Sequence, residues 1–211
     1  LIDLGFNYFG TANNHCMDYG REGLLSTIDT LDSYGQKHSG TGRSLTEAES
    51  PAVLEVNDKK IAVIAVDASF ETASKAGDAN IYLKARPGVN YLRHDSCYKV
   101  SEEQLEQLKN IADDTSINFT RNLEIATGYE LPDKDGEFMF GSTKFSIFDQ
   151  PKTICNASDK QRIINDVKKA KEENDYVFVL IHCHDDDGKK VYNPPEYLTE
   201  FCKAVIDAGS S

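Results

Sequence analysis

The alternation of apolar and polar positions divides the chain into short strands and helices. Residues 6–12 are aromatic or small and carry no charge, which is typical of a short buried strand. Residues 22–34 place Leu24 and Ile28 on one face of a helix, and Gly35 stands where a left-handed C-terminal cap is wanted. The chain therefore opens with a predicted strand followed by a predicted helix.

Two further segments predict β-hairpins. Residues 52–56 and 61–66 are apolar runs on either side of the polar stretch Asn-Asp-Lys-Lys, and the second run has the unbroken apolar character of a strand buried on both faces. Residues 137–148 alternate aromatic positions around a Gly-Ser turn, which indicates another hairpin. We expect the core to begin at the first of these hairpins.

The C-terminal part repeats the order helix, strand, helix. Ser158 is the expected N-cap of a helix that runs to about residue 174, and the apolar run at 176–181 predicts a buried strand. Residues 196–208 predict a final helix that stops at Gly209. Alternating helices and buried strands are typical of α/β proteins, whose sites form where strands end.

Residues 71–136 have a different composition, because Gly, Asp, Lys and Pro interrupt them repeatedly. Only residues 101–112 have a helical pattern, with Ser101 and Gln104 as a possible capping box. We interpret the remainder as a long surface excursion. Loops of that length usually cover or shape a site, so a lid and ordinary surface decoration both remain open as interpretations.

Length and charge narrow the possible partners. The 211 residues suit one domain. The 35 acidic and 23 basic side chains give a net charge of −12, which disfavours nucleic acid and anionic membranes as partners. The longest apolar run is far shorter than the roughly 20 residues of a membrane-spanning helix. Phosphate binding would then need cations between protein and ligand.

The cysteines and the first residues bear on the compartment. Five cysteines without a C-x-x-C pair favour reduced thiols and hence a cytoplasmic location. The chain begins at Leu1 on a pattern that reads like the end of a helix, so we expect a fragment of a longer protein. An upstream signal or anchor would instead make the protein extracellular or membrane-anchored.

Polar and titratable side chains gather after two of the predicted strands. In a parallel sheet, both strand ends would lie at the same edge. Imidazole, amide oxygen and carboxylate together suit a divalent metal such as manganese, iron or zinc. The residues concerned are Asn13, Asn14, His15 and Asp18 after the first strand, and His182, His184 and residues 185–187 after the later one.

Both groups also have an ordinary structural interpretation. Adjacent asparagines tolerate left-handed backbone and stabilise turns, and three successive aspartates at 185–187 suit a solvated loop. His182, at the end of an apolar strand, needs either a ligand or a hydrogen-bond partner in the core. Strand alternation places His182 and His184 on one face and Cys183 on the other, where Cys183 is expected to be a small core residue.

Four longer segments stand in a characteristic order. They are "LGFNYFGTANNHCMDYGREGLLSTIDTLDSYG", "GTGRSLTEAESPAVLEVNDKKIAVIAV", "YVFVLIHCH" and "EYLTEFCKAVIDAG". Together they resemble the CapA family of poly-γ-glutamate capsule synthesis proteins. The patterns A-N-N-H-x-x-D-Y-G and G-x-G-R-x-x-x-E-A make the resemblance specific. It is dense over residues 1–70 and looser over residues 158–209.

The resemblance implies an α/β fold of the calcineurin-like metallophosphoesterase type, an αββα sandwich with metal ligands on the loops after its strands. We expect a single such domain over residues 1–211, with a long insertion or lid at about 71–136. The domain would be incomplete at both ends. The family's opening strand, with a metal-binding aspartate, would precede Leu1, and its closing Gly-His-x-x-His-type motif would follow the last helix.

The resemblance also implies roles for particular residues. Asn14 and His182 would bind the metal, and His15 would be the catalytic acid. Family members usually continue after the later histidine with tryptophan and glycine, where this chain has Cys183 and His184, so the surroundings of the ligands differ. The residues expected to orient the site or to contact substrate are Asn13, Asp18 and His184.

The implied function is a metal-dependent phosphoesterase of capsule biosynthesis in bacteria, in which a water activated by manganese, iron, zinc or magnesium hydrolyses the substrate. The substrate would be a phosphorylated or acidic small molecule or polymer. Two alternatives remain: a non-catalytic protein that handles or assembles the acidic polymer and retains a vestigial metal site, and a metal-dependent hydrolase acting on a γ-linked glutamate amide. Were the chain complete as it stands, metal binding would be weak or absent.

Overall fold

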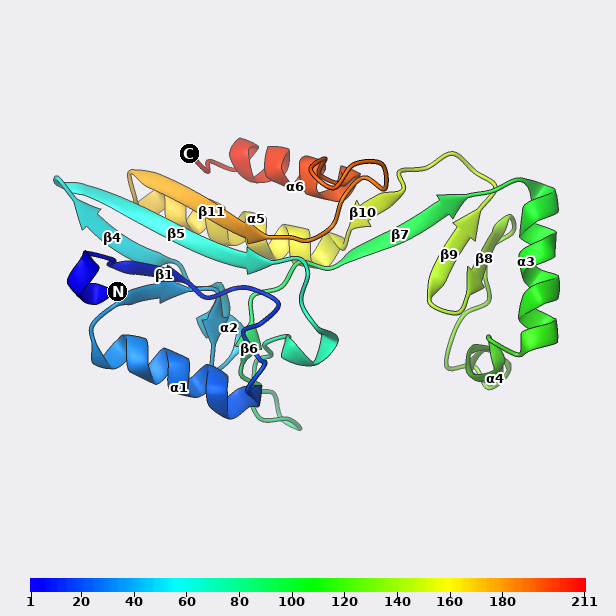
Figure 1. Cartoon of the computed structure of the whole chain (residues 1–211), viewed down its shortest axis with the longest axis horizontal. Coiled ribbons are helices and arrows are strands. Elements are labelled where there is room, and N and C mark those ends of the chain that lie inside the picture. The colour runs from blue at the N-terminus through cyan, green and yellow to red at the C-terminus, as the bar shows by residue number, and fades with distance from the viewer. The chain divides into compact units, whose positions relative to one another are not determined.

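The computed structural model describes all residues 1–211, and the chain separates into two compact units. The larger unit comprises Leu1–His94 and Cys155–Ser211, and the smaller unit comprises Asp95–Ile154. The strands form four small sheets (Figure 1). The chain is therefore a mixed α/β protein with several small sheets, which agrees with the predicted α/β class. The single-domain organisation with an insertion at 71–136 stays a prediction.

The larger unit is built on a three-stranded sheet in the order β11-β5-β4. Strands β4 (Ala52–Val56) and β5 (Lys59–Asp67) form the predicted antiparallel hairpin. Asn57 and Asp58 both have positive φ at its turn, the conformation that two-residue hairpin turns favour. Strand β11 (Tyr176–His182) runs parallel to β5, with Asp67 in register with His182.

Two helices cover one face of this sheet and form the main core with it. Helix α5 (Ala157–Glu173) and helix α6 (Glu196–Asp207) confirm the two predicted C-terminal helices. They bury their apolar stripes against alternate residues of β5. The principal core residues are Ala62, Ile64 and Val66 of β5, Ile163, Val167 and Ala170 of α5, and Tyr197, Phe201 and Val205 of α6.

Two details of this region differ from the sequence predictions. Asn156, not Ser158, is the N-cap of α5, because the helix begins at Ala157 and the Asn156 side chain accepts the backbone N–H of Asp159. Strand β11 is buried on one face only. Tyr176, Phe178 and Leu180 remain 41–45% exposed on the other face, because β11 is an edge strand whose helix-covered side is that of Val177.

A second layer lies on the opposite face of the sheet. Strand β1 (Tyr8–Gly10) pairs in parallel with β2 (Lys37–Ser39), and helix α1 (Gly20–Ser33) lies on the side of this pair away from β5 (Figure 1). Helix α1 confirms the predicted helix, with Leu24 and Ile28 buried and Gly35 left-handed beyond its end. Strand β1 is shorter than predicted and only half-buried. A 3-10 turn, η1 (Ile2–Leu4), precedes it.

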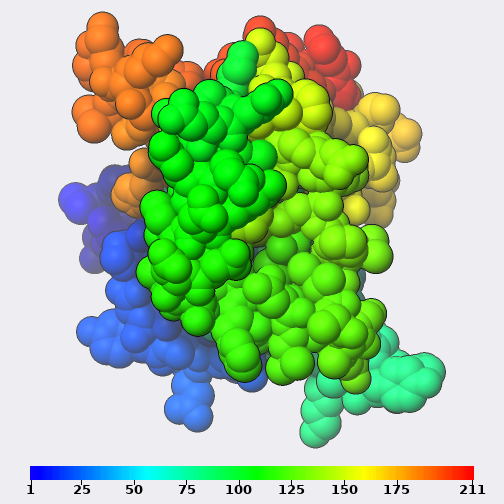
Figure 2. All heavy atoms as spheres, turned by 90° about the vertical axis from the view of Figure 1, so that its right-hand side faces the viewer, coloured from blue at the N-terminus to red at the C-terminus, as the bar shows by residue number.

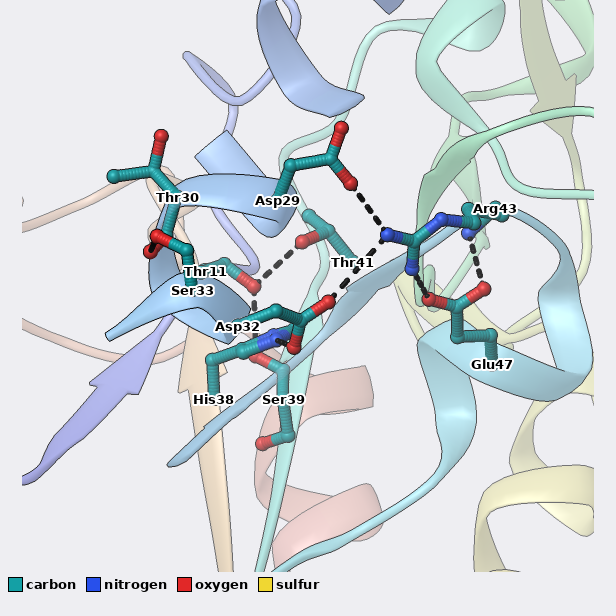
Figure 3. A network of polar contacts seen from close by, with 10 residues as sticks. All are labelled: Thr11, Asp29, Thr30, Asp32, Ser33, His38, Ser39, Thr41, Arg43 and Glu47. Atoms are coloured by element: carbon teal, nitrogen blue, oxygen red, sulfur yellow. Dashed lines mark hydrogen bonds and ion pairs between the residues drawn. The ribbon is translucent and has the colours of Figure 1, made fainter. Parts of the chain in front are cut away.

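The G-x-G-R-x-x-x-E-A pattern has a structural explanation. Figure 3 shows the Arg43 guanidinium between the Asp29 carboxylate of α1, 2.6 Å away, and the Glu47 carboxylate of helix α2 (Leu45–Glu49). The backbone N–H of Arg43 also donates to Glu47 at 2.9 Å. Asp32 lies 3.4 Å from the same guanidinium. These contacts connect α1 to α2 on either side of strand β3 (Thr41–Gly42).

The two glycines of the same pattern allow close backbone approach. Gly40 has a φ of +105°, and a Cβ there would lie 2.8 Å from the backbone nitrogen of Ala12 and 2.8 Å from the Cβ of Ala65. A Cβ at Gly42 would lie 2.4 Å from the backbone nitrogen of Ala48. Gly40 therefore sets how closely the chain after β1 approaches β5.

Part of the predicted surface excursion is core. Strand β6 (Gly88–Val89) pairs with β3, and Val89, Asn90 and Leu92 are fully inaccessible to solvent. The prediction of a surface position is therefore wrong for this stretch. Arg86 and Pro87, which are typical of a loop, directly precede the short buried strand. Between β5 and β6, the only regular element is the 3-10 turn η2 (Thr72–Ser74).

A four-stranded sheet lies in the smaller unit, except for its end residues His94 and Cys155, which belong to the larger unit. Its strands, β7 (His94–Lys99), β8 (Glu137–Phe140), β9 (Thr143–Ser146) and β10 (Thr153–Cys155), stand in the order β10-β7-β9-β8. The β8-β9 pair confirms the predicted hairpin, and helix α3 (Glu102–Thr115) has the predicted capping box at Ser101. Figure 2 shows α3 in green as a continuous column of side chains.

Two further observations concern the helices as a set. Helix α4 (Phe119–Ala126), which the sequence pattern did not reveal, follows α3 directly in the smaller unit. No helix in either unit combines the length and the apolar character that crossing a bilayer demands.

The packing at Gly40 yields a stability prediction. Gly40→Ala is expected to lower the free energy of unfolding by more than about 2 kcal/mol, because it adds a backbone clash to the strain of a positive φ. Gly35→Ala is the matched control, since Gly35 also has positive φ but nothing within 4 Å of an added Cβ. Its expected cost is about 1 kcal/mol. Equal costs in urea denaturation would contradict the packing role of Gly40.

Candidate functional site

The loop after β1 is a compact turn that presents two side chains. The Asn13 side chain accepts the backbone N–H of His15 at 2.9 Å, and the backbone N–H of Cys16 donates to the Asn13 carbonyl at 3.1 Å. The Thr11 hydroxyl, bonded to the Ser39 carbonyl and the Thr41 hydroxyl, fixes where the loop begins (Figure 3). Asn13 thus has the turn-forming role that adjacent asparagines favour.

Asn14 lies between the two histidines of interest. Its Oδ1 is 2.9 Å from Nε2 of His182, and its Nδ2 is 3.5 Å from Nε2 of His15. The structure therefore brings the end of β1 and the end of β11 together, although they are separated by 168 positions in sequence. The prediction that both strand ends lie at the same edge of one parallel sheet is wrong. The two strands belong to different sheets, and their ends meet because the two layers are stacked.

His15 is oriented from its other ring nitrogen. Its Nδ1 lies 2.9 Å from the Asp18 carboxylate, and the two side chains are 71% and 54% exposed. A polar contact this exposed contributes at most about 1 kcal/mol to stability. The contact mainly turns Nε2 of His15 toward Asn14 and solvent, where a ligand can reach it.

The later strand end is held by the end of β5. His182 and His184 lie on the same face, with ring centroids 4.7 Å apart in an edge-on arrangement, as strand alternation predicts. The backbone N–H of His184 donates to the Ser69 hydroxyl at 2.7 Å, and the backbone N–H of Ala68 donates to the His182 carbonyl at 2.9 Å. These bonds continue the β5-β11 pairing past the last strand residue.

Asp67 lies beside these residues, and the sequence analysis did not single it out. It is the last residue of β5, stands in register with His182 and has no solvent exposure. Its Oδ1 accepts the backbone N–H of Ser69 at 2.9 Å, but its Oδ2 is buried with no hydrogen-bond partner. Burial raises the pKa of the Asp67 carboxyl, and the bond from Ser69 and the imidazoles of His182 and His184 partly oppose this shift.

The same carboxylate affects the neighbouring loop. The Cys16 thiol has its pKa raised to about 11, chiefly by burial and then by the charge of Asp67. Cys16 is therefore a protonated thiol at neutral pH. In the sequence, only its position marks Asp67, as a carboxylate that ends an unbroken apolar run.

On the opposite face of β11, a hydrogen-bonded cluster holds the loop that follows the strand. The hydroxyl of Tyr197, a fully buried residue, donates to the Asp185 carboxylate at 2.6 Å and lies 3.3 Å from the Cys183 sulfur. The His94 ring stacks on Tyr197 with centroids 4.1 Å apart. Cys183 packs partly buried against the main core, as predicted. Asp185 therefore has a structural role, whereas the sequence predicted that residues 185–187 form a solvated loop.

The side chains fit part of a metal site. No three His, Cys, Asp or Glu side chains of the chain form a ready group of metal ligands. The pair Asn14 Oδ1 and His182 Nε2 has donor types that suit a divalent cation, and ligand bonds of about 2.0–2.2 Å at right angles put two donor atoms about 3 Å apart. The observed 2.9 Å matches this separation. In the hydrogen bond, Nε2 of His182 is the donor, so binding would move that proton to Nδ1.

Comparison with known proteins supplies the family context. Residues 1–211 match the family described as bacterial capsule synthesis protein PGA_cap. The uncharacterized protein y4sH of Sinorhizobium fredii (strain NBRC 101917 / NGR234) is 30% identical over 211 residues, which are 100% of this chain and 44% of that protein. The chain thus spans under half the length of this relative.

Two more distant relatives have informative names. The capsule biosynthesis protein CapA of Bacillus anthracis is 27% identical over 116 residues, covering 55% of this chain and 27% of that protein. A probable polyglutamine synthesis accessory protein of Mycobacterium tuberculosis (strain CDC 1551 / Oshkosh) is 29% identical over 98 residues, covering 46% of this chain and 25% of that protein.

The cluster around Tyr197 yields a prediction. Tyr197→Phe keeps the buried ring but removes the hydroxyl that holds Asp185, so the free energy of unfolding is expected to fall by about 1–3 kcal/mol. Tyr34→Phe is the control, since Tyr34 is 67% exposed, and it should leave stability unchanged. Chemical denaturation measures both. Equal stability of Tyr197→Phe and the wild type would show that the hydroxyl does not hold this loop.

Proposed function

Since the chain belongs to the bacterial capsule synthesis protein family PGA_cap, we propose that it contributes part of the active site of a divalent-metal-dependent phosphoesterase. The observation that supports this most strongly is the 2.9 Å approach of Asn14 Oδ1 to His182 Nε2 from loops of separate sheets. An amide oxygen and an imidazole nitrogen brought together in this way suit manganese, iron, zinc or magnesium.

The layer order of the larger unit supports the corresponding fold. Helices α5 and α6 cover one face of the β11-β5-β4 sheet, and the β1-β2 pair with α1 lies on the other (Figure 1). Helix, sheet, sheet and helix in succession is the order of a calcineurin-like metallophosphoesterase. We propose that the present chain adopts such a sandwich.

The proposed chemistry assigns one role to each side chain. Asn14 and His182 would hold the cation, which when bound lowers the pKa of water to about 7 and neutralises charge on a phosphoryl group. His15 lies beside Asn14 and donates a proton or a hydrogen bond to the leaving oxygen. Asp18 holds the His15 ring in position through Nδ1, and Asn13 holds the loop. His184, edge-on to His182, would face the substrate.

The substrate in this proposal is a phosphorylated or acidic small molecule or polymer. The net charge of −12 requires a cation to mediate contact with such an anion. Hydrolysis of a γ-linked glutamate amide uses the same ligands and differs in the bond that breaks. Analysis of the products, phosphate or free amine, separates these two reactions.

A second candidate function is handling of an acidic polymer without turnover. Two observations favour it: the chain has no complete group of three His, Cys, Asp or Glu ligands, and one relative is named an accessory protein of polyglutamine synthesis. In that case the Asn14 and His182 site would bind metal or polymer only. Binding of poly-γ-glutamate without any hydrolytic activity identifies this function.

Phosphoesterase activity is tested on the full-length gene product with an aryl phosphate and an aryl phosphodiester in the presence of Mn²⁺. His15→Ala is expected to lower kcat by about 10²–10⁴-fold with little change in metal affinity. His182→Ala is expected to lower activity through metal binding, so that higher Mn²⁺ concentrations restore part of the rate.

His38→Gln is the matched control. His38 bonds to Asp32 at 3.2 Å within the network of Figure 3 and has no contact with the site. Its rate should equal that of the wild type. A wild-type rate indistinguishable from those of both His15→Ala and His182→Ala would remove the phosphoesterase proposal and leave amide hydrolysis and polymer handling as the candidate functions.

A further inference from the structure

The Asp67 carboxylate is an unusual group for its position. Its residue has no solvent exposure, and one of its oxygens, Oδ2, is buried without a hydrogen-bond partner. A buried carboxylate that lacks partners is costly, so such groups are normally paired or bound to a cation. The hydrogen bond from Ser69 satisfies Oδ1 only. The second oxygen therefore needs an explanation.

The strand pattern shows which way Asp67 faces. Along β5, Ile64 and Val66 pack into the core under α5 and α6. Ala65 instead clusters with Ala12 and Val89, and Cys16 of the β1 loop packs against this cluster. Asp67 shares the face of Ala65, because alternate strand residues point the same way. Its side chain thus lies on the face covered by the loop that contains Asn14.

The neighbours of Asp67 on that face are the residues of the proposed site. Asp67 is in register with His182 on the adjacent parallel strand, so the two side chains extend from the sheet next to each other. It lies close enough to His182 and His184 to interact with both electrostatically, and close enough to Cys16 on the β1 loop to do the same. The charged neighbours that act on Asp67 are the imidazoles of His182 and His184.

We propose that Asp67 is a further metal ligand, whose buried Oδ2 binds the same divalent cation as Asn14 and His182. This assignment rests on the proposed function, since it adds a carboxylate to that site. It gives the chain one amide oxygen, one imidazole nitrogen and one carboxylate oxygen from three different segments, a donor set that suits manganese, iron or zinc. The negative charge of Asp67 offsets one positive charge of the cation, which Asn14 and His182 cannot do.

A second carboxylate with one buried oxygen provides the comparison. Asp166 of α5 also has an oxygen buried without a hydrogen-bond partner. Its charged neighbours are Glu49, Arg162 and Lys169, with no imidazole among them. It lines a cavity of about 260 Å³ between α2 and α5 that contains none of the proposed site residues. Asp166 therefore matches Asp67 in having one buried oxygen without a partner, but differs from it in surroundings and in being partly exposed as a residue.

The test measures Mn²⁺ binding directly on the full-length gene product, through the electron paramagnetic resonance signal of the free ion. Asp67→Asn keeps the shape of the side chain and removes its charge, and it is expected to weaken Mn²⁺ binding by about tenfold or more. Asp166→Asn, the matched control, should bind Mn²⁺ like the wild type. His182→Ala removes a ligand of the proposed site, and its Mn²⁺ affinity shows how much binding depends on that site.

Thermal unfolding gives a second, independent measurement. Mn²⁺ is expected to raise the Tm of the wild type more than that of Asp67→Asn, because tighter binding to the folded state stabilises it more. Without metal, Asp67→Asn should be at least as stable as the wild type, since it removes an unpaired buried charge. Should Asp67→Asn fail to fold, Asp67→Ser is measured in its place with the same expectation for Mn²⁺.

The outcomes separate this proposal from the one it rests on. Equal Mn²⁺ affinity in the wild type and Asp67→Asn, with weakened binding in His182→Ala, would overturn the role of Asp67 alone. No Mn²⁺ binding by the wild type would overturn both the role of Asp67 and the metal-dependent activity. Binding that depends on Asp67 without any phosphoesterase activity would support Asp67 as a ligand and contradict the proposed reaction.

Discussion

The contact between the Asn14 amide and the His182 imidazole is the one on which the rest of the site depends. It joins the ends of two strands from separate sheets, so it exists only when both layers of the larger unit are packed in register. Each end is held by its own bonds, Asn13 and Thr11 on one side and Ser69 on the other. The loops thus approach each other in a fixed arrangement, as a binding site requires.

Strand β5 is the constraint common to both layers. One set of its alternate residues forms the main core with α5 and α6, and the other set faces the β1 layer. Gly40 lets the chain after β1 approach Ala65 closely, and the Arg43 network fixes α1 and α2 around the same segment. Gly40 and Arg43 of the G-x-G-R-x-x-x-E-A pattern therefore position the site but do not belong to it.

Much of this arrangement could be predicted from the sequence, because local patterns determine most elements. The apolar stripes of α1, α5 and α6, the Asn57-Asp58 hairpin and the capping box of α3 were all visible in the residue order. Recognition of the family placed Asn14 and His182 together. What could not be predicted depends on tertiary packing: the separate sheets of β1 and β11, the exposed face of β11 and the buried strand near Val89. Asp67 was missed because its burial depends on tertiary packing, which a local pattern does not show.

Anomalous X-ray diffraction at the manganese absorption edge, from crystals of the full-length protein grown with Mn²⁺, shows whether Asn14 and His182 bind one metal ion. We expect an anomalous peak within bonding distance, about 2.0–2.3 Å, of both Asn14 Oδ1 and His182 Nε2. Well-diffracting crystals that show these two atoms still hydrogen-bonded to each other at saturating Mn²⁺, with no peak beside them, would contradict it.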